Sequence, residues 1–253
     1  MIINIAIGMK KLKKINFHKR DDRIIFDESN HSYTIDDSKE AKSVTQLISE
    51  YFPKFDRDYW AGNESRKTGE KVADILKRWE DLGSKARNEG TNLHNQIENF
   101  YNEIEYKNSP EFEKFMKFHE RYIVNKYEPF RTEWRVFDDS KLLAGTIDMV
   151  YKKSDSEVFL FDWKRSKKII DDGGNIEKDN PFENCLKGLS HMSSTDYNKY
   201  CLQQNIYKYI LEKNYKLNVS SMNLLILHPF YDSYHIIKVD ELPLETKYLI
   251  DSV

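Results

Sequence analysis

The spacing of hydrophobic positions changes once along the chain, near Phe130, and divides it into a helical part and a strand part. From Tyr59 to Lys126 apolar residues recur at helical spacing and prolines are almost absent, which predicts helices. One stripe contains Leu93, Ile97, Phe100, Tyr101 and Ile104. The sequence Asn108-Ser109-Pro110 interrupts this pattern, so we expect a second helix to begin there.

After Phe130 the hydrophobic period falls to two residues, as expected where helix gives way to strand. Three strands are predicted, with the sequences TEWRVF, LLAGTIDMVYK and EVFLFDWKRS. Their connections, DDSK and KSDSE, are short and polar, which favours an antiparallel meander. A long polar stretch from Ser166 to Thr195 follows, then a helix from Asp196 to Glu212 and two more strands, in SMNLLILHPF and SYHIIKV.

The N-terminal part is expected to be scaffold. Alternating residues on both sides of a turn at 28–30 predict a hairpin, and Ser43 or Thr45 would cap the helix that follows. The opening run MIINIAIGMKKLKK is interpreted as a first strand or a frayed tail, because it has the reverse order of a secretory signal and is too short to span a bilayer. No membrane association is therefore expected.

The length of 253 residues predicts one domain, with a hairpin and scaffold at 1–58, a helical part at 59–126 and the sheet with its last helix at 127–253. Charged residues make up 32% of the chain, but 13% aromatic residues and several apolar runs favour a packed globule. The only cysteines, Cys185 and Cys201, are too few for a disulfide framework or a four-thiolate site, which favours a reducing compartment inside the cell.

The net charge of -2 gives no global signature for nucleic acid, so any DNA contact has to come from local basic patches. Such runs lie at Lys10 to Lys14, at 18–20 and at 164–168. The last is the best candidate, with Arg165 and Lys167 placed to bind phosphates, although a charge run is more often a solvated face.

Candidate chemistry lies in the strand VFLFDWKRS. Its alternation places Asp162 and Lys164 on one face and Phe161 and Trp163 on the other. If Asp148 of the neighbouring strand points the same way, two carboxylates and an ammonium converge. This combination suits phosphodiester hydrolysis with Mg²⁺ or Mn²⁺, since carboxylate oxygens are the ligands that these ions prefer. Taken alone, however, Asp-x-Lys on a strand is usually a solvent-exposed pair.

Three further features favour a site. His94 lies beside the Leu93 stripe and could supply a nitrogen ligand, although an isolated histidine is usually a surface residue. Gln203 and Tyr207 are one helical turn apart beside an apolar stripe, which is equally typical of an ordinary amphipathic helix. The third feature is their order along the chain: histidine on a helix, strand Asp, strand Asp-x-Lys, then helical Gln-x-x-x-Tyr.

In this order the chain resembles the PD-(D/E)XK nuclease superfamily, in particular its RecB-like exonucleases, such as CRISPR adaptation nucleases and mitochondrial genome maintenance exonuclease. The resemblance runs from about Gly90 to Leu211, roughly half of the chain. It implies a restriction-endonuclease-like α/β fold, a three-layer core in which a central mixed sheet is flanked by helices. It also implies a metal-dependent DNA exonuclease of DNA replication, repair or recombination, with single-stranded DNA or free DNA ends as the expected substrate.

The resemblance implies the roles of individual residues. The metal ligands would be His94, Asp148, Asp162 and the backbone carbonyl of Trp163, and Lys164 would be the catalytic lysine. Gln203 and Tyr207 would line the site, contact DNA or orient the lysine. Glu133 stands where many relatives have an acidic residue on the first strand, and it is the weaker candidate because a surface strand residue is equally expected there.

Departures from the family pattern narrow the prediction. Gly145-Thr146-Ile147-Asp148 replaces the literal Pro-Asp, as is usual in the RecB-like branch, and the glycine would let backbone or substrate approach closely. The cysteines of an iron-sulfur cluster are missing, and no Walker A motif occurs, so we expect a cluster-free enzyme without a motor of its own. The alternatives are a structure- or sequence-specific endonuclease on the same fold and a catalytically silent nucleic-acid-binding subunit.

Overall fold

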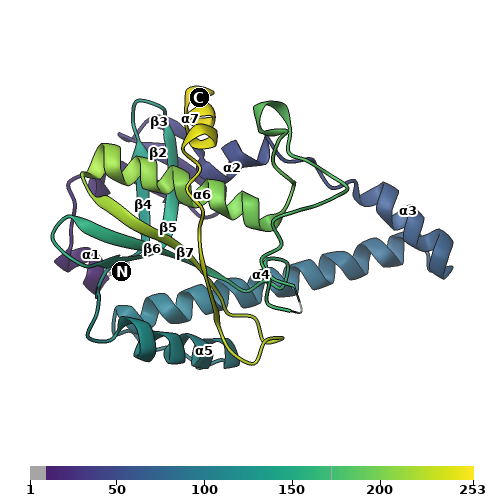
Figure 1. The fold of residues 1–253 in the computed structure, drawn as a ribbon, viewed down its shortest axis with the longest axis horizontal. Coiled ribbons are helices and arrows are strands. Elements are labelled where there is room, and N and C mark those ends of the chain that lie inside the picture. The colour runs from purple at the N-terminus through teal and green to yellow at the C-terminus, as the bar shows by residue number, and fades with distance from the viewer. Residues whose placement is uncertain (1–9, 172) are drawn as a thin grey trace, which may run out of the picture.

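The computed structural model describes residues 10–171 and 173–253, and its core is an eight-stranded mixed sheet with helices on both faces (Figure 1). The strands are β1 Ile24–Asp27, β2 Ser32–Ile35, β3 Lys39–Ser43, β4 Glu128–Asp138, β5 Leu143–Lys152, β6 Glu157–Lys164, β7 Asn218–Ile226 and β8 His235–Lys238. The α/β class and the flanked sheet expected from the sequence are confirmed. The opening run MIINIAIGMKKLKK was expected to be a strand or a frayed tail; residues 1–9 lie outside the described part, and Lys11 to Lys14 begin helix α1 instead.

The α-helices are α1 Lys11–Ile15, α2 Val44–Ser49, α3 Arg57–Thr68, α4 Val72–Tyr101, α5 Pro110–Phe118, α6 Asp196–Ile210 and α7 Pro243–Asp251. Short 3-10 turns lie at η1 Asp21–Arg23 and η3 Lys187–Leu189, and π-turns extend α5 and α6 at η2 His119–Ile123 and η4 Leu211–Tyr215. Ser43 caps α2 in a capping box, as one of the two expected alternatives, and Ser109 with Pro110 begins α5 as predicted.

The predicted meander is confirmed, because β4 pairs with β5 and β5 with β6, both antiparallel. β6 then pairs with β7 in parallel, with α6 in the crossover between them, and β8 closes this edge antiparallel to β7. At the other edge, β1, β2 and β3 form an antiparallel unit. The sequence patterns did not predict β3, which joins this unit to the main sheet.

The sheet forks at β5. β4 pairs with one edge of β5 along nearly its whole length, so β3 and β6 share the other edge. β3 pairs in parallel at Leu143 and Ala144, whereas β6 pairs only from Met149 to Lys152. Residues 145–148, which contain Asp148, therefore face a gap between two neighbouring strands. The candidate site lies at this gap.

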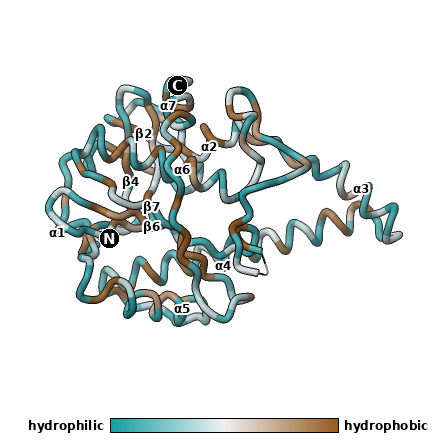
Figure 2. The backbone as a smooth tube through the Cα atoms, viewed as in Figure 1, coloured by the Kyte–Doolittle hydropathy of each residue, from teal (hydrophilic) through white to brown (hydrophobic). Residues whose placement is uncertain are grey.

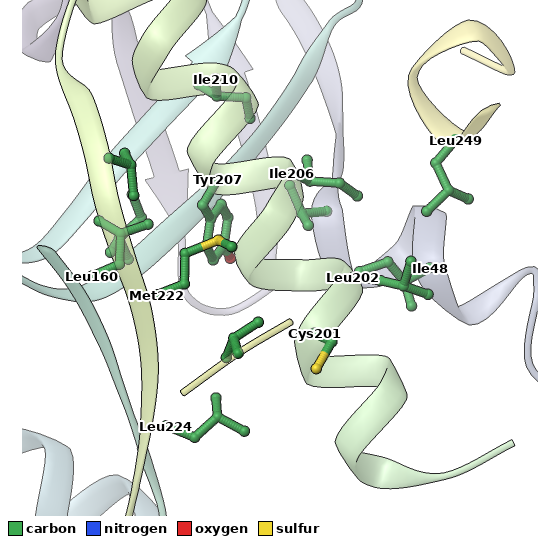
Figure 3. Close-up of a cluster of buried hydrophobic side chains, with 14 of the residues drawn as sticks. Ile48, Leu160, Cys201, Leu202, Ile206, Tyr207, Ile210, Met222, Leu224 and Leu249 are labelled. Carbon is green, nitrogen blue, oxygen red and sulfur yellow. The ribbon is translucent and has the colours of Figure 1, made fainter. Parts of the chain in front are cut away.

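Each face of the sheet is covered by its own helices. On one face, α6 packs Leu202, Ile206 and Ile210 against the strands, with Ile48 of α2 and Leu249 of α7 at its side (Figure 3). On the opposite face α4 and α5 contribute a second cluster that includes Trp163, Leu93, Ile97, Phe115 and Phe118. The hydropathy pattern agrees, since the central strands are mostly hydrophobic and the surrounding loops mostly hydrophilic (Figure 2).

The helix α4 is longer than the sheet that it covers. Its first half projects beyond the sheet and pairs with α3 to form a helical arm (Figure 1). Ion pairs join the two helices, from Arg57 to Glu80 at 3.3 Å and from Arg78 to Glu70, just after α3, at 2.9 Å. The second half of α4 carries His94 to the gap in the sheet. No helix in the described part of the chain is long and apolar enough to cross a membrane.

Candidate metal centre

Asp148 lies at the end of the β5–β6 pairing, where the two strands separate. Because β5 no longer pairs there, the backbone N–H of Trp163 is free to donate to Asp148 Oδ2, at 2.8 Å. The carboxylate is buried, with 9% of the residue exposed, and burial raises its pKa above the ordinary value. Asp148 is thus held in one orientation by the neighbouring strand, at a place where its negative charge is poorly solvated.

His94 reaches the same place from α4, on the other side of the gap. Its Nε2 lies 3.0 Å from the carbonyl oxygen of Trp163, and its Nδ1 lies 3.6 Å from Asp148 Oδ2 and 3.4 Å from Glu133 Oε1. Burial alone would lower the pKa of the imidazole, but Asp148 and Glu133 raise it to about 9. The histidine is therefore surrounded by acceptor oxygens.

Glu133 completes the group, although it was the weaker candidate of the residues that the family resemblance implied. Its backbone has φ of 43°, a left-handed conformation that is rare for a residue inside a strand and costs free energy. One ligand atom from each of His94, Glu133 and Asp148 lies within 4.8 Å of the other two. The strained residue is thus one whose side chain points into the cluster. Backbone strain of this kind is typically found at functional sites.

Asp162 and Lys164 form an ion pair of 2.5 Å between Oδ2 and Nζ beside this group. Burial raises the pKa of Asp162 to about 6, against the opposing effect of Lys164. Burial would lower the pKa of Lys164, but Asp162 and Asp148 raise it above its ordinary value. Phe161 and Trp163 lie in the core on the other face, so the predicted alternation along this strand is confirmed.

Gln203 and Tyr207 lie one turn apart on the side of α6 that faces the sheet, and Gln203 is the more exposed of the two. Gln203 is half-buried and donates through Nε2 to the hydroxyl oxygen of Tyr207, at 3.1 Å. Tyr207 is only 2% exposed and points from the helix toward the sheet beside Met222 (Figure 3). It therefore supports the floor of the site and is not accessible to a DNA strand in this conformation. The ring centroid of Tyr200, also on α6, lies 4.3 Å from Lys164 Nζ.

The two cations after Lys164 have different surroundings. Arg165 bridges Glu89 of α4 and Glu111 of α5, both at 2.7 Å, and its side chain is 12% exposed. It pins the end of β6 to the helix that carries His94, and its charge is already balanced. Lys167 is exposed and lies 5.4 Å from the ring centre of Phe230, so it remains accessible to a phosphate.

The donor set fits a hard divalent cation. Two carboxylates and one imidazole converge, a third carboxylate lies beside them, and the Trp163 carbonyl faces the imidazole. Three buried or half-buried carboxylates surround Lys164 and the imidazole of His94, and a bound cation would offset their mutual repulsion in place of a proton on His94. Asp162 is not part of the closest group because it pairs with Lys164. Glu98, one turn after His94, pairs instead with Lys10 at 2.5 Å.

Comparison with known proteins adds little to this geometry. No family model matches the chain, and no curated protein matches it. Among solved structures, one described as "Crystal structure of SSO0001" is similar with 14% sequence identity and a TM-score of 0.30. That match covers 83% of this chain and 71% of the other. A likeness at this level says nothing about activity.

Proposed function

We propose that the chain is a divalent-metal-dependent nuclease that hydrolyses phosphodiester bonds in DNA. The observation that supports this most directly is the group of His94, Glu133 and Asp148, with ligand atoms within 4.8 Å of one another, beside the ion pair of Asp162 and Lys164. Bound Mg²⁺ or Mn²⁺ supplies a water of lowered pKa and neutralises negative charge on the phosphate. The residues that would hold it are His94, Glu133, Asp148 and Asp162, with the Trp163 carbonyl.

Lys164 has a defined part in this proposal. Because neighbouring carboxylates keep its pKa above the ordinary value, the ammonium stays protonated at neutral pH. As an ammonium it would donate hydrogen bonds to a phosphate oxygen and stabilise charge that develops there. The ring of Tyr200, 4.3 Å away, stabilises the cation in this position.

The other residues position this group. The Trp163 N–H orients Asp148, and Arg165 ties β6 to α4, so that His94 and the Asp-x-Lys strand keep their relative position. On the α6 side, Tyr207 supports the floor of the site and accepts a hydrogen bond from Gln203. Lys167 is exposed next to the site and would contact a phosphate beside the scissile one.

The proposal is tested with purified protein, Mn²⁺ or Mg²⁺ and end-labelled DNA. We expect single-stranded DNA to be degraded, and Asp148→Asn to reduce the rate at least about 100-fold without unfolding the protein. Comparing linear with circular substrates separates the exonuclease that we propose from an endonuclease. If no form of DNA or RNA is cleaved with either metal, the chain is not a nuclease.

A further inference from the structure

A groove opens on the side of the candidate metal centre away from α6. It has a volume of about 980 Å³ and lies between the β1–β2 hairpin, α1, α4 and β4. His94 and Glu133 line it together with Phe26, Arg135 and Lys13. We call it the hairpin groove. A molecule that fills the hairpin groove therefore touches two residues of the metal group, and its volume is typical of clefts that bind ligands.

Some of the positively charged side chains that line the hairpin groove form ion pairs with carboxylates, and others do not. Arg131 forms an ion pair with Asp21 at 2.7 Å, and Lys10 is paired with Glu98. In contrast, Arg135 and Lys13 have no carboxylate partner among residues 10–171 and 173–253. Both are half-buried, so their charges face the groove with reduced access to water. Two such cations beside a metal group favour a ligand with more than one phosphate.

Aromatic rings lie next to these charges. Phe26 packs against Tyr33, with ring centres 4.6 Å apart, and the guanidinium of Arg135 lies 5.5 Å from the Phe26 ring centre. The exposed His31 ring meets Phe26 at its edge, at 5.1 Å. Phe26 is thus a supported, half-buried ring with a cation beside it. Such rings stack on nucleotide bases, and this requires bases that are not paired in a duplex.

We propose that the hairpin groove binds the segment of single-stranded DNA that adjoins the scissile phosphate. Arg135 and Lys13 contact its phosphates, and Phe26 stacks on one of its bases. This inference rests on the proposed nuclease function and adds a strand-binding site on the hairpin side to the basic run after Lys164. Duplex DNA lacks the free base face that Phe26 requires, so the groove would select single strands.

Two variants separate the two kinds of contact. Arg135→Gln removes a phosphate contact, and Phe26→Leu removes the ring face but keeps an apolar side chain. Arg121→Gln, an exposed arginine outside the groove, is the matched control. The substrates are a short oligodeoxythymidylate and an abasic strand of the same length. For each protein, KM and kcat are measured with Mn²⁺ across a salt series, together with binding by fluorescence anisotropy.

We expect Arg135→Gln to raise KM about tenfold on both strands and to reduce the slope of log KM against log salt by about 0.7. Phe26→Leu should raise KM about fivefold on oligodeoxythymidylate and leave the abasic strand unchanged. The Mn²⁺-induced thermal shift should stay the same in both, because neither residue belongs to the metal group.

The failures of the two proposals differ in these assays. If the unmodified protein cleaves single strands and neither variant changes KM or the salt slope, the hairpin groove is not the strand site. If the protein binds strands through Arg135 and Phe26 but never cleaves them, the groove stands and the nuclease proposal is overturned. If the unmodified protein neither binds nor cleaves any strand, both proposals are wrong.

Discussion

A Cβ at Gly145 would lie 2.6 Å from Cε1 and 2.8 Å from the hydroxyl oxygen of Tyr207. The strand that carries Asp148 and the helix that carries Gln203 therefore meet at a position where only glycine fits. From the sequence we expected Gly145 to let backbone or substrate approach closely, but the ring of Tyr207 occupies this space. The Gly145–Tyr207 contact couples the strand of Asp148 to the Gln-x-x-x-Tyr helix.

We expect Gly145→Ala to destabilise the fold by about 1–3 kcal/mol, because the added methyl group has to displace a fully packed tyrosine. The same displacement moves Gln203, which hydrogen-bonds to Tyr207, so activity should fall as well. Urea unfolding of the metal-free protein measures the first effect, and initial rates at saturating Mn²⁺ measure the second.

Gly90→Ala is the control, since a Cβ at this position of α4 meets nothing within 4 Å. It should stabilise the protein by about 0.5–1 kcal/mol, through the higher helix propensity of alanine. Equal stability of Gly145→Ala and the unmodified protein would show that Tyr207 is not confined by this contact.

The parts of the fold that sequence patterns predicted are those with a strong local signal. The period-two runs gave β4, β5 and β6 in the right order and pairing, because their connections are too short for anything but hairpins. Alternation along β6 correctly placed Asp162 and Lys164 on one face, since this follows from strand geometry alone.

Other features depend on contacts between distant segments and left no local signal. β3 pairs with β5 across about 100 residues, and its sequence, KEAKS, has no strand-like alternation of apolar residues. The position of Glu133 depends on a left-handed backbone inside β4, which no sequence pattern of an ordinary strand indicates. Arg165 looked like a phosphate-binding cation, because Glu89 and Glu111 become its neighbours only in the folded chain.

Glu133→Gln tests whether this residue is a metal ligand. We expect Mn²⁺ to stabilise the unmodified protein by about 2.7 kcal/mol at a concentration 100-fold above its Kd, and the variant to lose most of this effect at the same concentration. The metal-free variant should unfold at nearly the same temperature as the unmodified protein, because Glu133 is half-buried and its hydrogen bond to His94 is long, at 3.4 Å. Thermal unfolding with a Mn²⁺ titration measures both.

Glu98→Gln is the matched control, because this glutamate lies one turn beyond His94 but pairs with Lys10. Its Mn²⁺ stabilisation should equal that of the unmodified protein. If Glu133→Gln keeps the full shift while Asp148→Asn loses it, Glu133 lies beside the metal and does not bind it.

A pH-dependent contribution to stability is expected from Asp138, at the end of β4. Burial would raise its pKa, but Lys213, at 2.7 Å, and Ser140 lower it below the ordinary value of 3.8. Since the folded state favours the ionised form, this carboxylate stabilises the fold above pH 3.8, and the contribution is lost as the pH falls through the lowered pKa. Asp138→Asn should therefore cost about 1–2 kcal/mol at pH 7 and progressively less in acid.

Urea unfolding at several pH values tests this expectation. Asp155→Asn is the control, because its ion pair with Lys152 is at the surface and its removal should have no measurable effect at any pH. A constant difference between Asp138→Asn and the unmodified protein from pH 7 down to acid would mean that ionisation of Asp138 does not contribute.

Lys164→Met separates catalysis from metal binding. Methionine keeps the apolar stem of Lys164, but without the ammonium the buried Asp162 loses its ion-pair partner, so we expect a less stable variant that is assayed below its unfolding temperature. Loss of a charge that stabilises the reacting phosphate should reduce kcat by about 10²- to 10³-fold.

Removing the Lys164 cation from beside Asp162 and Asp148 should at the same time tighten Mn²⁺ binding, because the metal ion no longer competes with Lys164 for the carboxylates. Single-turnover rates and a Mn²⁺ titration by calorimetry measure the two effects, and Lys168→Met, an exposed lysine, should change neither. If kcat and metal affinity fall together, Lys164 holds the metal group in place and does not act on the phosphate.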